Sequence, residues 1–535
     1  MANLFRSVKV NKPKRNVFDL SHEVKLTTQM GRLTPILCQE VVPGDKFRVN
    51  VQSLIRLAPM IAPVMHRVNV YTHFFFVPNR LIWDDWETFV TGGADGNAMP
   101  VAPFFNLPQS QFNLYLKPSS LCDYFGIPIP EQGTNVPADF SLKFSALPFR
   151  AYQLIYNEYY RDQNLIDPVP VIKTSGQDTQ YDQLWYRNRA WEKDYFTSAL
   201  PWTQRGADVS IPLGGIAPVI QNPDYIDNAA SIKNIDGTDV KGDPNTGKLT
   251  VISDGTMYYQ EGDGSGSTSA EVFLNPAGTL VADLGDSTSV TINELRRSMK
   301  LQEWLERNAR GGSRYIEQIL SHFGVMSSDS RLQRPEYLGG GKSPVVISEV
   351  LQTSSTDNAS PQANMAGHGI SAGTMHQFTK FFEEHGFVIG IMSVLPKTAY
   401  QQGLPKMFQR DDKFDYYYPE FAHLGEQEIK NKELYIDWLD TSGTTYNDKP
   451  FGYTPRYAEY KYTPSSVHGD FRQSLAFWHL GRIFANKPNL NGDFVTSNPS
   501  ERIFATADGS DKLWIQLYNE VKALRPMPKF GTPYF

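Results

Sequence analysis

The pattern of apolar and polar positions predicts short β-strands over most of the chain. Within residues 41–57, Phe47, Val49 and Val51 alternate with a polar series, Lys46, Arg48, Asn50 and Gln52. This period of two is typical of a strand with one buried face. Residues 68–77 are apolar at nearly every position, which predicts a strand buried on both faces. Further strand-like runs cover residues 344–350, 386–394 and 433–439, and Gly- and Pro-rich connections separate them. The pattern indicates a mainly β protein.

Three helices are predicted from period and end signals. Leu147-Pro148 begins one that extends to about Asp162, because proline is tolerated in the first turn. Thr291-x-x-Glu294 is a capping box, and it precedes an apolar face that ends near Gly311. Ser313 is expected to cap the third helix, which Gly324 ends.

One polar, acidic stretch interrupts this pattern. Residues 206–290 carry twelve acids against three lysines, a net charge of −9 in a chain whose total is −6. A segment rich in Gly, Asp, Asn, Ser and Thr is typical of a solvent-facing insertion on a packed scaffold. We therefore divide the chain into residues 1–205, the insertion 206–290, and residues 291–535.

Composition limits the class of protein further. The 535 residues include 32 Phe, 27 Tyr and 36 Pro, which favours strands joined by long ordered loops. The two cysteines, Cys38 and Cys122, are too few for a disulfide framework and indicate folding in a reducing cytoplasm. The N-terminus lacks the apolar stretch of a secretory signal, and the longest apolar run, 387–395, is too short to span a bilayer. A soluble protein without membrane insertion is expected.

Catalytic motifs are sparse. Gly339–Ser343 resembles the end of a phosphate-binding loop, but Glu336 stands where the pattern needs its first glycine, so a plain Gly-rich loop is expected. His368, His376 and His385 do not have the spacing of metal ligands. We predict no catalytic residue, no metal site and no cofactor, and this favours a structural role.

Both ends of the chain are basic. The first fifteen residues contain no acid, and residues 521–535 read as an extended arm rich in proline. Two interpretations of these segments remain: they contact a polyanion, or they are frayed, solvated tails. The candidate residues for contact with a polyanion are Arg6, Lys9, Lys12, Lys14, Arg15, Lys522, Arg525 and Lys529.

Residues 181–205 interleave aromatic and basic side chains. The aromatic members considered for an interface are Trp185, Tyr186, Trp191 and Trp202. Such interleaving can stack bases and pair with phosphates. A protein interface or core edge with cation–π contacts is the favoured alternative, because Trp and Arg also anchor protein interfaces.

Several blocks, in order along the chain, resemble the major capsid proteins of the Microviridae, gokushovirus branch. These blocks are Pro63–Trp86, Leu147–Asp162, Asp194–Trp202, Ser321–Val325 with Arg331–Gly340, Ala458–Pro464 and Phe471–Leu480. His66 and Arg67 depart from the family pattern in the first block and receive no family role.

The resemblance implies an eight-stranded antiparallel viral jelly roll with large loop insertions and a few short helices. It implies about sixty copies in a T=1 icosahedral shell around circular single-stranded DNA. The insertion 206–290 would form threefold protrusions that face a host receptor. Small DNA-binding or internal scaffolding proteins of the virion are further expected partners, and assembly would take place in the bacterial cytoplasm. The resemblance implies no catalytic residues.

Two other classes remain as alternatives. A jelly-roll carbohydrate-active enzyme would use the aromatic cluster as a sugar platform. A lectin-like host-binding protein would package no nucleic acid.

Overall fold

The structure is a computed structural model, and it describes most of the chain. It describes residues 14–131, 133–207, 209, 219–221, 231–234, 248–251, 257–261, 268–275, 280–282, 292–312, 314–351, 365–506 and 509–530. The chain divides into two compact units, one made of residues 1–205 and 306–535 and the other of residues 206–305. Each unit is described by itself.

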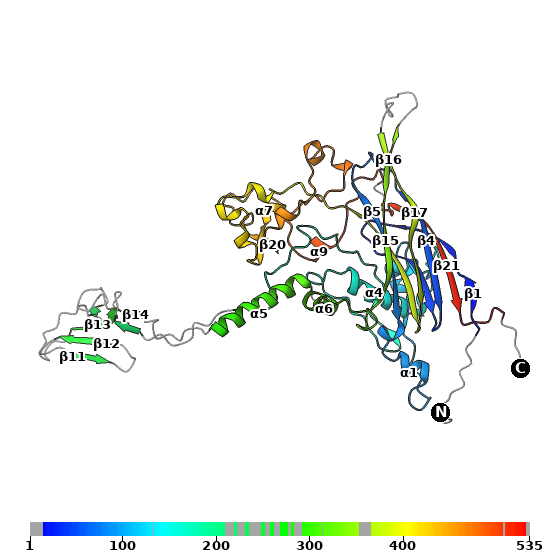
Figure 1. Ribbon diagram of the computed structural model, residues 1–535, viewed down its shortest axis with the longest axis horizontal. Helices are drawn as coiled ribbons and strands as arrows, with labels where there is room; N and C mark the ends of the chain where they lie inside the picture. The colour runs from blue at the N-terminus through cyan, green and yellow to red at the C-terminus, as the bar shows by residue number, and fades with distance from the viewer. Residues whose placement is uncertain are drawn as a thin grey trace. The chain divides into compact units, whose positions relative to one another are not determined.

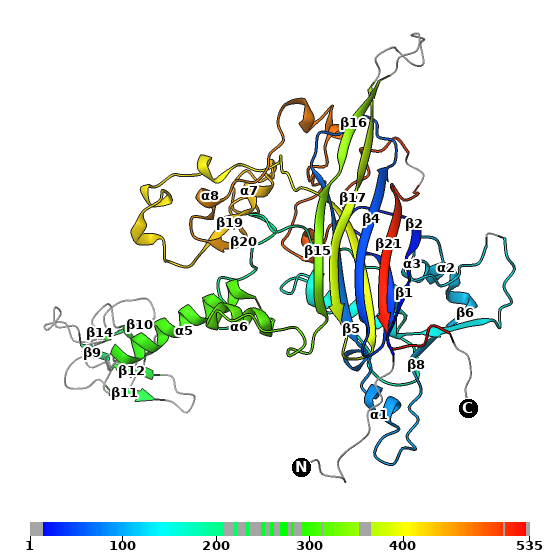
Figure 2. The same ribbon diagram turned by 45° about the vertical axis from the view of Figure 1, so that its right-hand side comes forward.

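Two antiparallel sheets form the centre of the larger unit (Figures 1 and 2). The first sheet has the order β1-β21-β4-β17-β16, and β2 also pairs with β21. Its strands are β1 (Asn16–Asp19), β2 (His22–Thr28), β4 (Lys46–Leu57), β16 (Val346–Leu351), β17 (Met365–Phe381) and β21 (Leu513–Arg525). The second sheet has the order β15-β5-β18-β3, with β3 (Thr34–Val41), β5 (Val68–Pro78), β15 (Glu336–Pro344) and β18 (Gly386–Pro396).

One apolar core draws on both sheets, and the predicted alternation produces it. Phe47, Val49 and Val51 of β4 are fully buried in a cluster that also holds Phe74 of β5 and Leu517 of β21. The strand predicted within residues 41–57 is therefore confirmed, with its polar positions on the opposite face.

The strand predicted at 68–77 is confirmed as β5, and every residue of it except His73 is buried. Its second face contributes Phe75 and Val77 to another apolar cluster, which includes Phe149 and Tyr152 of the helix that begins at Leu147. A continuous apolar run is what burial on both faces requires.

The predicted helices are present, with differences at their ends. The first is α4 (Leu147–Ile155), which continues as a π-helical turn, Tyr156–Tyr160. The second is α5 (Ile292–Gly311), and Thr291 lies outside the described residues. The third is α6 (Tyr315–Phe323), which ends at Gly324 with a φ of 67°. Its N-cap is Arg314 and not Ser313, which also lies outside the described residues.

Three local predictions are wrong. The expected Gly-rich loop at 339–343 is part of strand β15, because its glycines let the strand pass close to β5: a Cβ on Gly340 would lie 2.3 Å from His73 Cδ2. The run 433–439 is not a strand, since α7 (Asn431–Leu434) covers its start and Glu433 accepts a hydrogen bond from the Lys430 backbone N–H at 2.9 Å. The expected arm from residue 521 begins later, because residues 521–525 belong to β21.

Smaller elements complete the larger unit. They are α1 (Trp86–Thr91), β6 (Phe104–Pro108), α2 (Phe112–Tyr115), α3 (Leu121–Tyr124), β7 (Ser141–Ser145), β8 (Gln177–Asp178), β19 (Glu426–Lys430), β20 (Pro450–Pro455), α8 (Ala458–Lys461) and α9 (Gly492–Val495), with short 3₁₀ turns between them. No helix among the described residues is long and apolar enough to cross a membrane.

The smaller unit contains the whole acidic stretch 206–290 and has strands of its own. A four-stranded sheet has the order β10-β13-β12-β11, and β14 pairs with β9. The strands are β9 (Val219–Gln221), β10 (Ser231–Asn234), β11 (Lys248–Val251), β12 (Met257–Glu261), β13 (Thr268–Asn275) and β14 (Leu280–Ala282). The sequence pattern did not predict this sheet. That residues 206–290 face solvent stays a prediction, because the structure describes the side chains of only a few of these residues.

Candidate assembly and nucleic-acid surfaces

The two basic ends of the chain leave the first sheet at the same end of the paired strands β1 and β21. β1 pairs with the end of β21, with Asn16 opposite Arg525, and the Asn16 side chain donates to the Met527 carbonyl at 2.7 Å. Lys14, Arg15 and Lys529 are exposed beside this pair of strands. The structure thus brings these candidates together. Arg6, Lys9 and Lys12 lie outside the described residues.

Arg525 is committed to the fold. Its Nη2 donates to the Glu40 carbonyl at 2.6 Å, and its Nε lies 3.4 Å from an oxygen of buried Asp45. Its guanidinium stands over the Phe47 ring, 5.2 Å from the ring centroid. Lys522 is exposed and lies 3.2 Å from Glu520. Of these two candidates, Lys522 is the one whose charge is accessible to a ligand.

Sequence reasoning missed the surface that Lys522 belongs to. We define the basic–aromatic face as the partly or fully exposed positions of β1, β2, β4 and β21 on the outer side of the first sheet (Figure 2). Its cations are Lys25, Lys46, Arg48, Arg56 and Lys522, its aromatic residues are Trp514 and Tyr518, and its acids are Asp19, Glu23 and Glu520. The signal was present in part, because the polar half of the alternation at 46–52 forms the β4 side of this face.

Strand pairing sets the geometry of the face. Arg56 lies opposite Trp514, and Arg48 lies opposite Lys522. Trp514 is 46% exposed and Tyr518 is 40% exposed, and they occupy the same face of β21 four residues apart, roughly 13 Å along the strand. A guanidinium beside an exposed indole can pair with a phosphate while the ring stacks on a base. The face therefore has the chemistry of a single-stranded nucleic-acid platform.

The aromatic cluster at 181–205 is distributed over several places. Trp185 packs edge-on against Tyr115, and the Arg32 guanidinium covers the Tyr186 ring at 4.0 Å. Trp191 is buried beneath Arg482, while Trp202 is half-buried with Arg205 at 5.5 Å from its ring. Each ring has a nearby cation or aromatic partner at the edge of the core. A role in subunit contacts stays a prediction.

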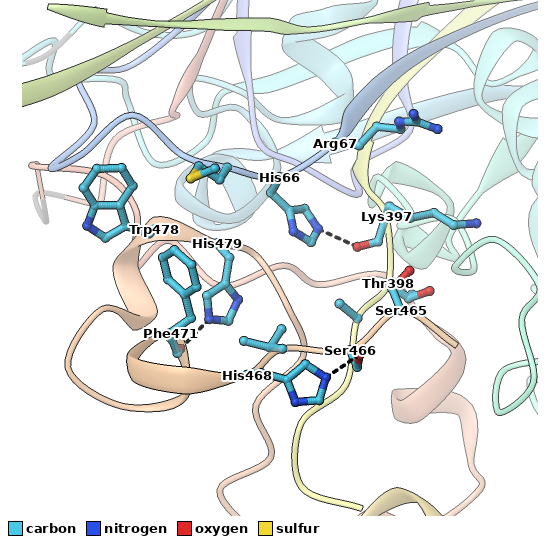
Figure 3. Close-up of a pocket in the computed structure, with 13 residues that line it drawn as sticks. His66, Arg67, Lys397, Thr398, Ser465, Ser466, His468, Phe471, Trp478 and His479 are labelled. Carbon is cyan, nitrogen blue, oxygen red and sulfur yellow. Dashed lines mark hydrogen bonds between the residues drawn. The ribbon is translucent and has the colours of Figure 1, made fainter. Parts of the chain in front are cut away.

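A pocket of about 410 Å³ lies where the segments before β5 and after β18 meet residues 465–479 (Figure 3). His66 Nε2 is 2.6 Å from the Lys397 carbonyl, and His479 Nε2 is 2.8 Å from the Phe471 carbonyl. Burial lowers the pKa of His66 to about 4 and also lowers the pKa of His479.

Both rings are therefore neutral near pH 7. The charged ends of Arg67 and Lys397 point away from the histidine rings in Figure 3. None of the thirteen described residues that line this pocket is Asp, Glu or Cys. In the described part of the chain, no group of three or more His, Cys, Asp or Glu residues could hold a metal ion.

Comparison with known proteins finds relatives that match nearly the whole chain. A family model described as "Capsid protein (F protein)" matches residues 6–535. The chain is 41% identical to the "Capsid protein VP1" of Chlamydia phage 1, over 100% of this chain and 98% of the relative. It is 40% identical to the protein of the same name from Bdellovibrio phage phiMH2K, over 97% of this chain and 95% of the relative. For the "Capsid protein VP1" of Spiroplasma virus 4 the identity is 32%, over 99% and 97%.

Proposed function

Because this chain belongs to the phage capsid protein family whose members include the F proteins, we propose that about sixty copies of it close a T=1 icosahedral shell around circular single-stranded DNA. That it is a capsid protein follows from membership in the family, which implies a structural role and many copies in one particle. The size of the shell, its contents and the orientation of the subunit are the proposal.

We propose that the two central sheets are an eight-stranded viral jelly roll. The order of strands supports this: β2-β21-β4-β17 in one sheet stands against β15-β5-β18-β3 in the other. Along the chain these strands alternate between the sheets, except that β5 and β15 are neighbours in one sheet. Such crossing connections are expected for a double-sheet jelly roll. The strands β1 and β16 extend the first sheet at its two edges.

The basic–aromatic face carries the proposal of DNA contact. Five cations against three acids leave it positively charged, and two half-exposed aromatic rings lie among them. Lys14, Arg15 and Lys529 add charge at the edge where both ends of the chain leave. We place this face and both basic ends, including Arg6, Lys9 and Lys12, on the inner surface of the shell.

Salt dependence of DNA binding tests this orientation. The variant Arg48→Gln with Arg56→Gln removes two cations. The slope of log K against log salt for single-stranded DNA should therefore become less steep, by about 1.4 in magnitude. Trp514→Ala should weaken binding by stacking alone and leave the slope unchanged. The matched control replaces the exposed residues Arg331 and Lys461 by glutamine. Equal effects in the control, or an unchanged slope in the double variant, would show that this face does not bind DNA.

The remaining partners follow from the same placement. The stretch 206–290 forms the threefold protrusion and contacts the host receptor, and its charge of −9 suits an outer surface. The four aromatic residues Trp185, Tyr186, Trp191 and Trp202 contribute to contacts between subunits. Small DNA-binding or internal scaffolding proteins join the particle, which assembles in the bacterial cytoplasm.

A further inference from the structure

The loop that follows α7, the helix labelled in Figure 1, carries two large apolar side chains that are exposed. Trp438 is 84% exposed and Leu439 is 88% exposed. Single exposed apolar residues are ordinary on a protein surface. A neighbouring pair that includes the largest apolar side chain, at the tip of a well-fixed loop, requires a different explanation.

The carboxylate of Asp437 fixes the loop on one side of this pair. Asp437 Oδ1 accepts a hydrogen bond from the Leu439 backbone N–H at 3.2 Å, and Oδ2 lies 2.6 Å from Lys487 Nζ. Asn447 also binds the Asp437 backbone twice, with its side-chain oxygen accepting at 2.9 Å and its side-chain nitrogen donating at 2.9 Å. The hydrogen bond from Lys487 lowers the pKa of Asp437, so this contact persists at neutral pH.

The carboxylate of Asp440 fixes the other side. Its Oδ2 accepts from the backbone N–H groups of Tyr446 and Asn447, both at 2.8 Å. The Tyr446 side chain is buried, and its hydroxyl donates to the Pro488 carbonyl at 3.1 Å. The loop is therefore tied to the body of the larger unit on both sides of Trp438 and Leu439, while the two side chains themselves point into solvent.

We propose that Trp438 and Leu439 are an anchor for a second copy of this chain, a role that rests on the proposed shell function. A docking tryptophan removes on the order of 150–250 Å² from water, and such rings dominate interface energetics. A loop already fixed in its bound conformation loses little entropy when it docks. The second copy is the partner because membership in a capsid protein family implies assembly of many copies into one particle, and closed symmetry repeats each contact around the shell.

Assembly of purified subunits measures the anchor. Trp438→Ala should require about tenfold or more higher subunit concentration for particles to form, as for loss of an interface hot spot. Trp438→Phe should recover part of the difference. The matched control is Met326→Ala, because Met326 is also 84% exposed and, like Trp438, lies outside any helix or strand. Circular dichroism of the free subunits should be the same for all variants, since Trp438 makes so little contact within its own subunit.

A second measurement identifies what the anchor touches. The photo-crosslinking residue p-benzoylphenylalanine at position 438 should link two copies in particles and leave dissociated subunits unlinked. If the unmodified chain forms no particles, the proposed function itself fails. If it does form them, and Trp438→Ala assembles at the same concentration or position 438 yields no link between copies, the anchor is refuted. Particles of Trp438→Ala that form normally but no longer attach to host cells would assign the loop to the host and overturn this proposal as well.

Discussion

The pair Arg150–Asp178 is buried so completely that its loss should loosen the whole region around α4. Both side chains are fully inaccessible, and Arg150 Nη2 lies 3.3 Å from Asp178 Oδ2. The guanidinium also donates to the carbonyls of Ile82 at 3.2 Å and Thr174 at 3.1 Å. Burial lowers the pKa of Arg150, and the carboxylate of Asp178 acts against this effect. One side chain thus joins three segments of the chain.

Arg150→Met removes these bonds and leaves a buried carboxylate with two remaining donors, the Gln183 side chain and the Gln180 backbone. Removal of one partner from a buried pair costs about 3–5 kcal/mol. The double variant with Asp178→Asn no longer buries an unpaired charge, so it should be more stable than Arg150→Met alone, with a coupling energy of about 1–3 kcal/mol. Glu23→Gln is the control, because it breaks an exposed pair with Lys25 that is worth less than about 1 kcal/mol.

Hydrogen exchange followed by mass spectrometry measures the effect locally, which suits a chain of several units better than one unfolding midpoint. A loss of 3–5 kcal/mol should speed exchange in peptides covering residues 147–160 by roughly a hundredfold to several thousandfold. In Glu23→Gln, peptides from β2, which contains Glu23, and peptides covering residues 147–160 should exchange as in the unmodified chain. An acceleration below tenfold for Arg150→Met, or a double variant less stable than the single one, would refute the reasoning.

Three further outcomes are expected. Burial lowers the pKa of both His66 and His73 to about 4, so their contribution to stability is complete above pH 6.5 and is lost as the pH falls toward 4. At pH 5 each histidine should lower the free energy of unfolding by about 2 kcal/mol relative to its value above pH 6.5. The melting temperature of His66→Gln should therefore depend less on pH than that of the unmodified chain. Gly340→Ala should destabilise the subunit by about 1–3 kcal/mol in urea unfolding, because its Cβ would meet the backbone of β5, whereas Gly373→Ala, with open space around it, should not. Replacing residues 206–290 by a short Gly/Ser linker should leave a folded subunit, because loop length costs little, and particle yield or host attachment should fall; a linker variant that cannot fold would show that the stretch is part of the core.

Local pattern was enough to predict the elements whose burial depends on their own sequence. The alternation around Phe47 and the apolar run of β5 each specify which faces are buried, whichever strands pair with them. The helices at 147 and 315 carry their own end signals. The jelly-roll expectation, in contrast, came from resemblance to a family.

Features that depend on residues distant in the sequence could not be predicted from the local sequence pattern. The glycines of β15 have the composition of a loop. They form a strand because β15 packs too closely against β5, which is distant in the sequence, for a side chain to fit at Gly340. The basic–aromatic face joins Arg56 near one end of the chain to Trp514 near the other, and neither position is distinctive alone. The run 433–439 has strand composition, but the carboxylates of Asp437 and Asp440 bind nearby backbone N–H groups and hold a turn.

A reconstruction of particles assembled from this chain with single-stranded DNA would test the central claim most directly. We expect a closed shell in which the strands β2, β4 and β21 turn their polar side inward, with density for nucleic acid against Trp514 and Tyr518. A shell with that side facing the solvent, or a chain that remains a single subunit under every assembly condition, would contradict it.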